Sequence, residues 1–132
     1  MIEENTEYLW VYGTLKSTHS HPMQLKLRQY AHFVHTGIYQ GKLYRIDWYP
    51  ALVPSDHPSD VVHGEVYQIQ NRQLLFQALD QYEGYSGSDL ENSEYIRKIE
   101  SVKTEDGCSL NCWMYVYNRS VDSYPVIQSG VF

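Results

Sequence analysis

One glutamate stands where a carboxyl group is expected to keep its proton more readily than usual. The apolar residues between Asn71 and Tyr82 recur at helical spacing, so the sequence predicts a helix that starts after Asn71 and ends at Glu83-Gly84. A helix C-terminus carries partial negative charge, which disfavours another anion, and Gly84 suits the left-handed position that ends a helix. Such a carboxyl group in a cleft suits general acid/base catalysis, with a solvated surface glutamate as the alternative.

The second candidate is the turn Tyr12-Gly13-Thr14-Leu15, which follows a run typical of a buried strand at residues 7–12. A glycine directly after such a strand lets the backbone approach a ligand closely. Successive N–H groups in a turn can also form a concave anion site, which would hold a carboxylate. The alternative is purely structural, because a strand followed by Gly-Thr is a common way for a chain to leave a sheet.

The histidines give only weak evidence for a metal site. His19 and His21 lie in a polar loop, and no nearby carboxylate or cysteine completes a ligand set at the usual spacing. His32 and His35 would face opposite sides of a strand. No nucleophile elbow surrounds any serine or cysteine, which argues against a Ser-His-Asp or Cys-His enzyme. The sequence therefore predicts no catalytic metal and no cofactor.

The two cysteines, Cys108 and Cys112, are predicted to be free. On a straight strand their Cα atoms would lie about 13 Å apart, whereas a disulfide allows roughly 7 Å. A tight hairpin between them would undo this, but Gly107 is the better turn residue, and a reducing compartment favours free thiols.

Composition narrows the classes of partner. The 132 residues fit a single domain, and 10 basic against 16 acidic residues give a net charge of −6, which argues against nucleic acid. The acidic, polar start is unlike a secretory signal, and no apolar stretch approaches membrane-spanning length, so we expect a cytoplasmic protein that binds no membrane. The 13 tyrosines exceed what a core usually satisfies, so several are expected to line a polar cavity.

The elements that must position these residues form an α+β domain over residues 1–132, with a mainly antiparallel, barrel-like sheet and about two helices. Pro22 is suited to begin the first helix, which continues to Tyr30. We expect 48–54 to be a turn-rich passage because it carries two prolines, and the tail 118–132 to be mostly irregular. Strands are predicted at 7–12, 32–39, 41–46, 61–69, 95–103 and 109–117, with Gly37 and Gly41 as bends or bulges.

In order and spacing, segments along nearly the whole chain resemble the motifs of the gamma-glutamylcyclotransferase-like family, and most closely its short gamma-glutamylamine cyclotransferase branch. The final Ser129-Gly130-Val131-Phe132 departs from the acidic-aromatic end of bacterial members, which leaves the role of the tail open. The matching segments are Val11-Tyr12-Gly13-Thr14-Leu15-Lys16, Gly41-Lys42-Leu43-Tyr44, Tyr49-Pro50-Ala51-Leu52, Val62-His63-Gly64-Glu65-Val66-Tyr67, Leu79-Asp80-Gln81-Tyr82-Glu83-Gly84-Tyr85, Tyr95-Ile96-Arg97 and Trp113-Met114-Tyr115-Val116-Tyr117.

The resemblance implies an enzyme that releases 5-oxoproline from a gamma-glutamyl amine or amino acid, a small-molecule substrate whose own alpha-amine attacks its gamma-carbonyl. Glu83 would be the general acid/base, and the backbone of Gly13, Thr14 and Leu15 would hold the substrate alpha-carboxylate. Weaker candidates for the pocket walls are Tyr12, Tyr44, Tyr95 and Arg97.

Two other functions stay open at this point. The same fold could serve as a non-catalytic module that binds a small ligand, or as an acyltransferase or hydrolase that acts on another acyl donor. The identity of the leaving amine and the oligomeric state are not predicted. Loops such as 48–58 and 85–94 would contact the amine, but their sequences do not reveal the shape of a pocket.

Overall fold

The computed structural model describes residues 6–13, 15–19 and 21–132, which form six strands and two helices. Thr14, which belongs to the predicted substrate turn, lies outside the described residues. In chain order the elements are β1 (Tyr8–Val11), α1 (Pro22–Tyr30), β2 (Ala31–Ile46), β3 (Tyr49–Pro54), β4 (Val61–Ile69), α2 (Arg72–Glu83), β5 (Tyr95–Thr104) and β6 (Ser109–Tyr117).

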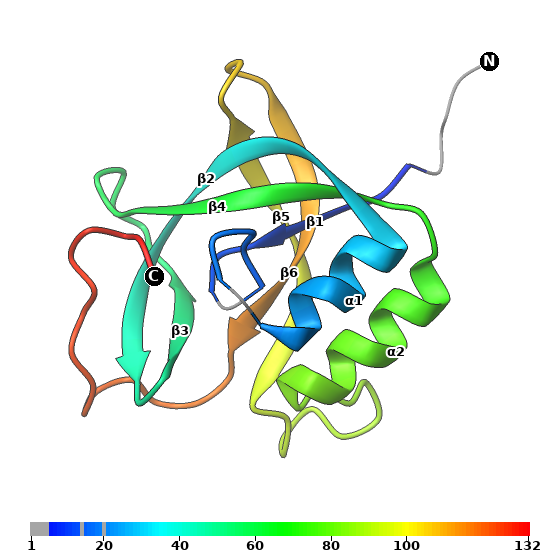
Figure 1. Cartoon of the computed structure of the whole chain (residues 1–132). Coiled ribbons are helices and arrows are strands. Elements are labelled where there is room, and N and C mark those ends of the chain that lie inside the picture. The colour runs from blue at the N-terminus through cyan, green and yellow to red at the C-terminus, as the bar shows by residue number, and fades with distance from the viewer. Residues whose placement is uncertain (1–5, 14, 20) are drawn as a thin grey trace.

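The sheet closes on itself (Figure 1). Its strand order is β3-β2-β4-β1-β6-β5, and an additional pairing of β2 with β5 joins five of the strands into a barrel, leaving β3 attached at the edge of β2. All pairings are antiparallel except that of β1 with β6, which is parallel. The predicted mainly antiparallel, barrel-like α+β fold is therefore confirmed.

One long strand, β2, replaces the two segments predicted at 32–39 and 41–46. Its first part pairs with β4 and its last part with β3, so pairing partners are present on both sides of Gly41 and the chain has no reason to break there. The register shift lies between Phe33 and His35 instead. Gly37 lies where β2 pairs with β5 and closes the barrel. A Cβ atom there would lie 2.6 Å from a Val102 Cγ atom of β5, so only glycine allows the two strands to approach this closely.

The passage 48–54, predicted to be turn-rich, contains β3. Pro50 and Pro54 pair with residues of β2, and β3 has no other strand neighbour. Proline is compatible with such an edge strand because a missing N–H group costs nothing on the unpaired side. Ala51 and Leu52 between the prolines are fully buried, so burial outweighs the local turn preference.

Both predicted helices are confirmed, and so is the predicted cap of α2 at Asn71. His21 caps α1 by accepting a hydrogen bond from the N–H group of Met23, and Asn71 caps α2 in the same way from Leu74. Figure 1 shows the two helices side by side against one end of the barrel. Their buried leucines pack with residues of β1 and β4 in one core cluster, which includes Leu9, Leu27, Tyr67, Leu75 and Leu79.

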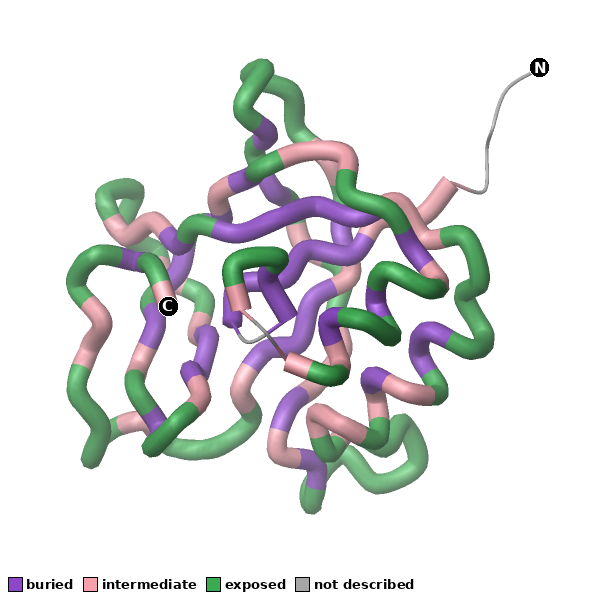
Figure 2. Tube along the Cα trace, in the orientation of Figure 1, coloured by how far each residue is buried: buried purple, intermediate pink, exposed green. Residues whose placement is uncertain are grey.

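A second core cluster joins buried residues from all six strands, and Figure 2 shows buried stretches along these strands. The β5–β6 hairpin turns at Gly107, which has a φ of 86°, as predicted. Cys108 and Cys112 are both free. The tail after β6 is mostly irregular and meets the sheet through a bridge between Tyr44 and Val126. In the part of the chain that is described, neither helix has the length and apolarity needed to cross a membrane.

Candidate active site

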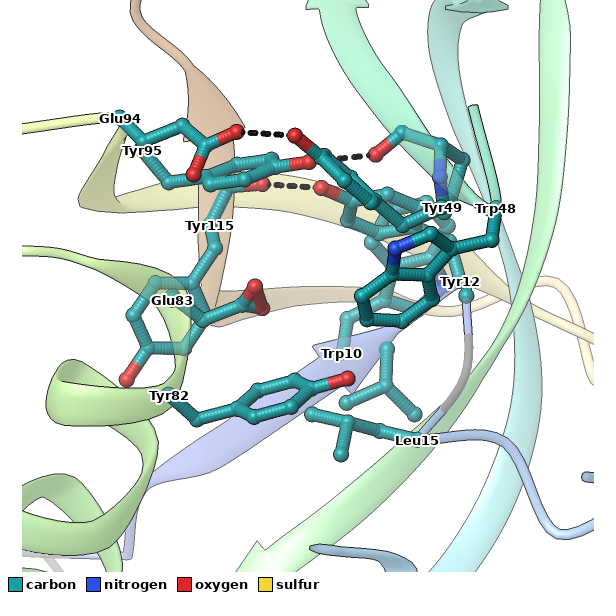
Figure 3. A pocket seen from close by; sticks show the side chains of 13 residues that line it. Trp10, Tyr12, Leu15, Trp48, Tyr49, Tyr82, Glu83, Glu94, Tyr95 and Tyr115 are labelled. Carbon is teal, nitrogen blue, oxygen red and sulfur yellow. Dashed lines mark hydrogen bonds between the residues drawn. The ribbon is translucent and has the colours of Figure 1, made fainter. Parts of the chain in front are cut away.

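A cavity of about 130 Å³ lies between the C-terminal end of α2, the end of β1 and the start of β3 (Figure 3). Figure 3 shows the Glu83 carboxyl group pointing into it among aromatic rings. The described residues that line the cavity are Trp10, Val11, Tyr12, Gly13, Leu15, Trp48, Tyr49, Pro50, Tyr82, Glu83, Glu94, Tyr95 and Tyr115.

Glu83 owes its position to the end of α2. It is the last helical residue, and Gly84 follows with a φ of 68°, in the left-handed conformation that the sequence predicts. One turn earlier, Asp80 accepts hydrogen bonds from Arg97 (2.9 and 3.2 Å) and from the hydroxyl group of Tyr115 (2.7 Å). These bonds join α2 to β5 and β6, so the helix end is fixed relative to the barrel.

The environment of Glu83 raises the pKa of its carboxyl group to about 8. Burial is the larger cause, because a partly desolvated carboxylate loses hydration, and the negative charge of Glu94 is the second. The sequence-based expectation of a raised proton affinity rested only on the helix end. A carboxyl group of this pKa can both accept and release a proton near neutral pH.

The raised pKa predicts a pH-dependent stability. The folded state holds the Glu83 proton more tightly than the unfolded chain, so this contribution is complete below about pH 4.5 and is lost as the pH rises through about 8. Replacement Glu83→Gln removes the loss, and we expect it to raise the free energy of unfolding at pH 8 by about 1–3 kcal/mol, a figure reduced for partial exposure. Urea denaturation of both proteins at several pH values measures this. A stability difference that stays constant with pH would contradict it.

The tyrosines of the cavity hold their hydroxyl groups against fixed acceptors. Tyr12 donates to the carbonyl oxygen of Tyr115 at 2.5 Å and Tyr95 to that of Pro50 at 2.6 Å. Burial raises the pKa of Tyr12 and of Tyr95, so both phenols stay neutral. Several tyrosines line the cavity as expected, but the lining is more apolar than polar, contrary to the expected polar cavity. The hydrogen-bonded tyrosines act as rigid walls.

The turn after β1 approaches the cavity with its backbone. A Cβ atom on Gly13 would meet a Pro50 Cγ atom at 2.9 Å, so this position requires close packing between the turn and β3. The N–H group of Lys16 donates to the carbonyl oxygen of Gly13 at 3.0 Å and closes the turn. Gly13 and Leu15 both line the cavity, and both are buried.

Two predicted wall residues lie elsewhere. The Arg97 guanidinium is bound to Asp80 and lies over the ring of Phe76, at 3.9 Å from its centroid. Tyr44 sits on β2, where it pairs with Ala51 of β3. Neither is among the described residues that line the cavity. Side chains alternate between the two faces of a strand, but the sequence does not show which face points toward the cavity. That direction depends on the twist of the sheet and on how the barrel closes.

The clearest cavity residue that the sequence does not single out is Glu94, the last residue of the loop 85–94. It lines the cavity, and its carboxylate accepts a hydrogen bond from the hydroxyl group of Tyr49 at 2.6 Å. Its only local signal is that it directly precedes the predicted wall residue Tyr95. Trp48 begins the loop 48–58 that is expected to contact the leaving amine, and it does line the cavity although it is 58% exposed.

The histidines considered for a metal have other contacts. His21 caps α1, and the ring of His19 lies 3.1 Å from the carbonyl oxygen of Phe132. Among the described residues, one group has metal-ligand spacing, formed by His35, Glu105 and Asp106. It does not line the cavity, and exposed acidic groups of this kind are common without an ion.

Fold and cavity together define a small α+β barrel protein whose cavity holds a candidate general acid/base, Glu83. The chain belongs to the family described as Gamma-glutamyl cyclotransferase, AIG2-like, whose match spans residues 9–132. It is 36% identical to the gamma-glutamylcyclotransferase family protein ytfP of Citrobacter rodentium, over 92% of this chain and 91% of the relative. It is 34% identical to YtfP of Escherichia coli K12, over 92% of each chain.

Solved structures agree with this family. The solution structure of ytfP from Escherichia coli superposes with a TM-score of 0.61 at 33% identity and covers 95% of each chain. A mouse AIG2-like protein superposes with a TM-score of 0.71 over 96% of this chain and 88% of its own. At 23% identity, the mouse protein supports the fold alone.

Proposed function

We propose that this protein releases 5-oxoproline from a gamma-glutamyl amine or a gamma-glutamyl amino acid, with Glu83 as general acid/base. The observation that carries the proposal is the Glu83 carboxyl group, which points into the cavity and has a pKa of about 8. A carboxyl group at this position does not stabilise the fold, because burying it beside another negative charge is unfavourable. The position is therefore better explained by a role in catalysis.

In the proposed reaction the substrate supplies its own nucleophile. The Glu83 carboxylate takes a proton from the substrate alpha-ammonium, and the freed nitrogen attacks the gamma-carbonyl carbon, forming the C–N bond of the five-membered ring. The bond between the gamma-carbon and the departing nitrogen then breaks as Glu83 returns this proton to that nitrogen. The same carboxylate then passes a second proton from the ring nitrogen to the released amine, which leaves the ring nitrogen with the single hydrogen of 5-oxoproline. The products are 5-oxoproline and a free amine, so the balance needs no water, metal or redox partner.

The turn after β1 would orient the substrate. We propose that the backbone around Gly13 and Leu15 holds the substrate alpha-carboxylate through N–H groups, together with Thr14 between them. The tight contact between Gly13 and Pro50 supports this, because it keeps a side chain out of that corner of the cavity. Tyr12 and Tyr95 would act as fixed walls that bend the gamma-glutamyl chain toward its own carbonyl group.

The test is a panel of gamma-glutamyl amines, gamma-glutamyl amino acids and glutathione, assayed for 5-oxoproline release by chromatography with and without a chelator. We expect release from at least one member, unchanged by the chelator. No release from any member by the folded protein would overturn the proposal and favour a small-ligand binding module or an enzyme that uses another acyl donor. Loss of release with the chelator would overturn the metal-independent mechanism.

A further inference from the structure

A buried carboxylate behind the cavity binds the turn that lines it. Glu65 lies on β4 with 8% of its surface exposed, and it is absent from the cavity lining. Its Oε1 atom accepts a hydrogen bond from the backbone N–H group of Ser17 at 2.7 Å, and its Oε2 atom accepts one from the Ser17 hydroxyl group at 2.5 Å. Charge-assisted bonds of this length are among the stronger ones in proteins.

Two further buried groups extend this contact to the cavity-lining part of the turn. The hydroxyl group of Tyr67 donates to Glu65 at 3.2 Å and accepts from the Gln24 side-chain amide at 2.9 Å. The same amide nitrogen donates to the backbone carbonyl oxygen of Leu15 at 3.2 Å. Glu65, Tyr67 and Gln24 thus form a network from β4 and α1 that holds the turn at Leu15 and at Ser17.

The charge of Glu65 also acts on the residue between these two points. Lys16 is only 7% exposed, and burial lowers the pKa of its amine while attraction to Glu65 opposes that change. Among the described residues no salt bridge joins Lys16 to a carboxylate, so the Glu65 charge acts on it without direct contact. A neutral residue at position 65 would leave this buried amine without the attraction.

The geometry points to Glu65 as a positioning residue, which holds Leu15 and Ser17 so that the cavity-lining residues Gly13 and Leu15 are ready to receive the alpha-carboxylate of the substrate. The identity of the ligand rests on the proposed function, whereas the clamp itself does not. A site whose donors are fixed in advance loses less freedom when the ligand binds, so the clamp is expected to act on substrate binding rather than on proton transfer.

The kinetic test compares Glu65→Ala with Glu65→Gln, which keeps one acceptor oxygen for the Ser17 N–H group. Each is assayed with the best substrate of the panel and with its analogue that lacks the alpha-carboxylate. For the full substrate we expect Glu65→Ala to raise KM at least about tenfold, with the pH dependence of kcat unchanged and much of the loss restored in Glu65→Gln. For the analogue, kcat/KM should be the same in Glu65→Ala and wild type. Equal losses on both substrates would overturn the proposal.

A second readout needs no turnover. Hydrogen exchange resolved by NMR should show the Ser17 amide exchanging at least about tenfold faster in Glu65→Ala, with the amides of Leu9 and Val66 as slow as in wild type. If Glu65→Ala does not fold, Ser17→Ala removes one of the two bonds from the exposed side and should show a smaller shift of KM in the same direction. Wild-type protein that releases no 5-oxoproline would refute the proposed function, whereas unchanged Ser17 exchange in a folded variant would refute the clamp.

Discussion

Glu83→Gln is expected to slow the release of 5-oxoproline, with kcat lowered by about 10³-fold while the fold is kept. The amide has nearly the shape of the carboxyl group but cannot take the proton from the alpha-ammonium or return it to the departing nitrogen, and general acid/base groups typically contribute about 10²–10⁴-fold. KM should change little, because the amide still fills the same part of the cavity.

The measurement compares wild type and Glu83→Gln at several pH values, with circular dichroism to show that both are folded. Glu91→Gln is the matched control, since it makes the same chemical change at an exposed glutamate in the loop after α2 and should leave kcat unaltered. A turnover rate for Glu83→Gln within threefold of wild type would assign the proton transfers to another group.

Asp80→Asn is expected to cost about 2–4 kcal/mol of stability. The Arg97 and Asp80 side chains are 15% and 24% exposed, so this pair is better shielded from water than the other ion pairs among the described residues. Asparagine keeps the size of the side chain but cannot balance the guanidinium, which would remain largely buried and uncompensated. The Tyr115 hydroxyl group also loses its charged acceptor.

Urea denaturation measures this change, and Lys42→Met provides the comparison. Lys42 and Asp60 approach only to 3.9 Å with the lysine side chain 43% exposed, so that variant should lose less than about 0.5 kcal/mol. Because Asp80 lies one turn before Glu83, Asp80→Asn should also lower activity in the folded fraction. Similar stabilities for the two variants would show that the Arg97–Asp80 pair does not anchor α2.

The features that the sequence predicted well have local causes. The N-cap at Asn71, the leucine spacing and Gly84 all lie within α2 or directly beside it, so the position of Glu83 followed from neighbouring residues. The strand at 61–69 agrees with β4 at both ends because β-branched residues lie between a polar loop and the next helix cap. The catalytic role of Glu83 itself stays a prediction until turnover is measured.

The features that the sequence did not predict depend on distant partners. The edge strand β3 contains two prolines, and only pairing with β2 and burial of Leu52 outweigh their turn preference. Arg97 on β5 forms an ion pair with Asp80 on α2, and a loop separates these two elements in the sequence. The residues next to Arg97 and Asp80 in the sequence do not indicate this pairing. Glu94 reaches the cavity through its contact with Tyr49, 45 residues earlier in the chain.

The place of β1 in the barrel has a consequence for synthesis on the ribosome. This strand emerges before the other strands of the barrel, yet it pairs with β4 on one side and with β6 on the other. Its second partner ends at Tyr117, so one edge of β1 stays unpaired until β6 has been made. Leu9, Trp10 and Val11 are apolar throughout that interval and offer a site for premature association. A length of only four residues limits that exposure during translation.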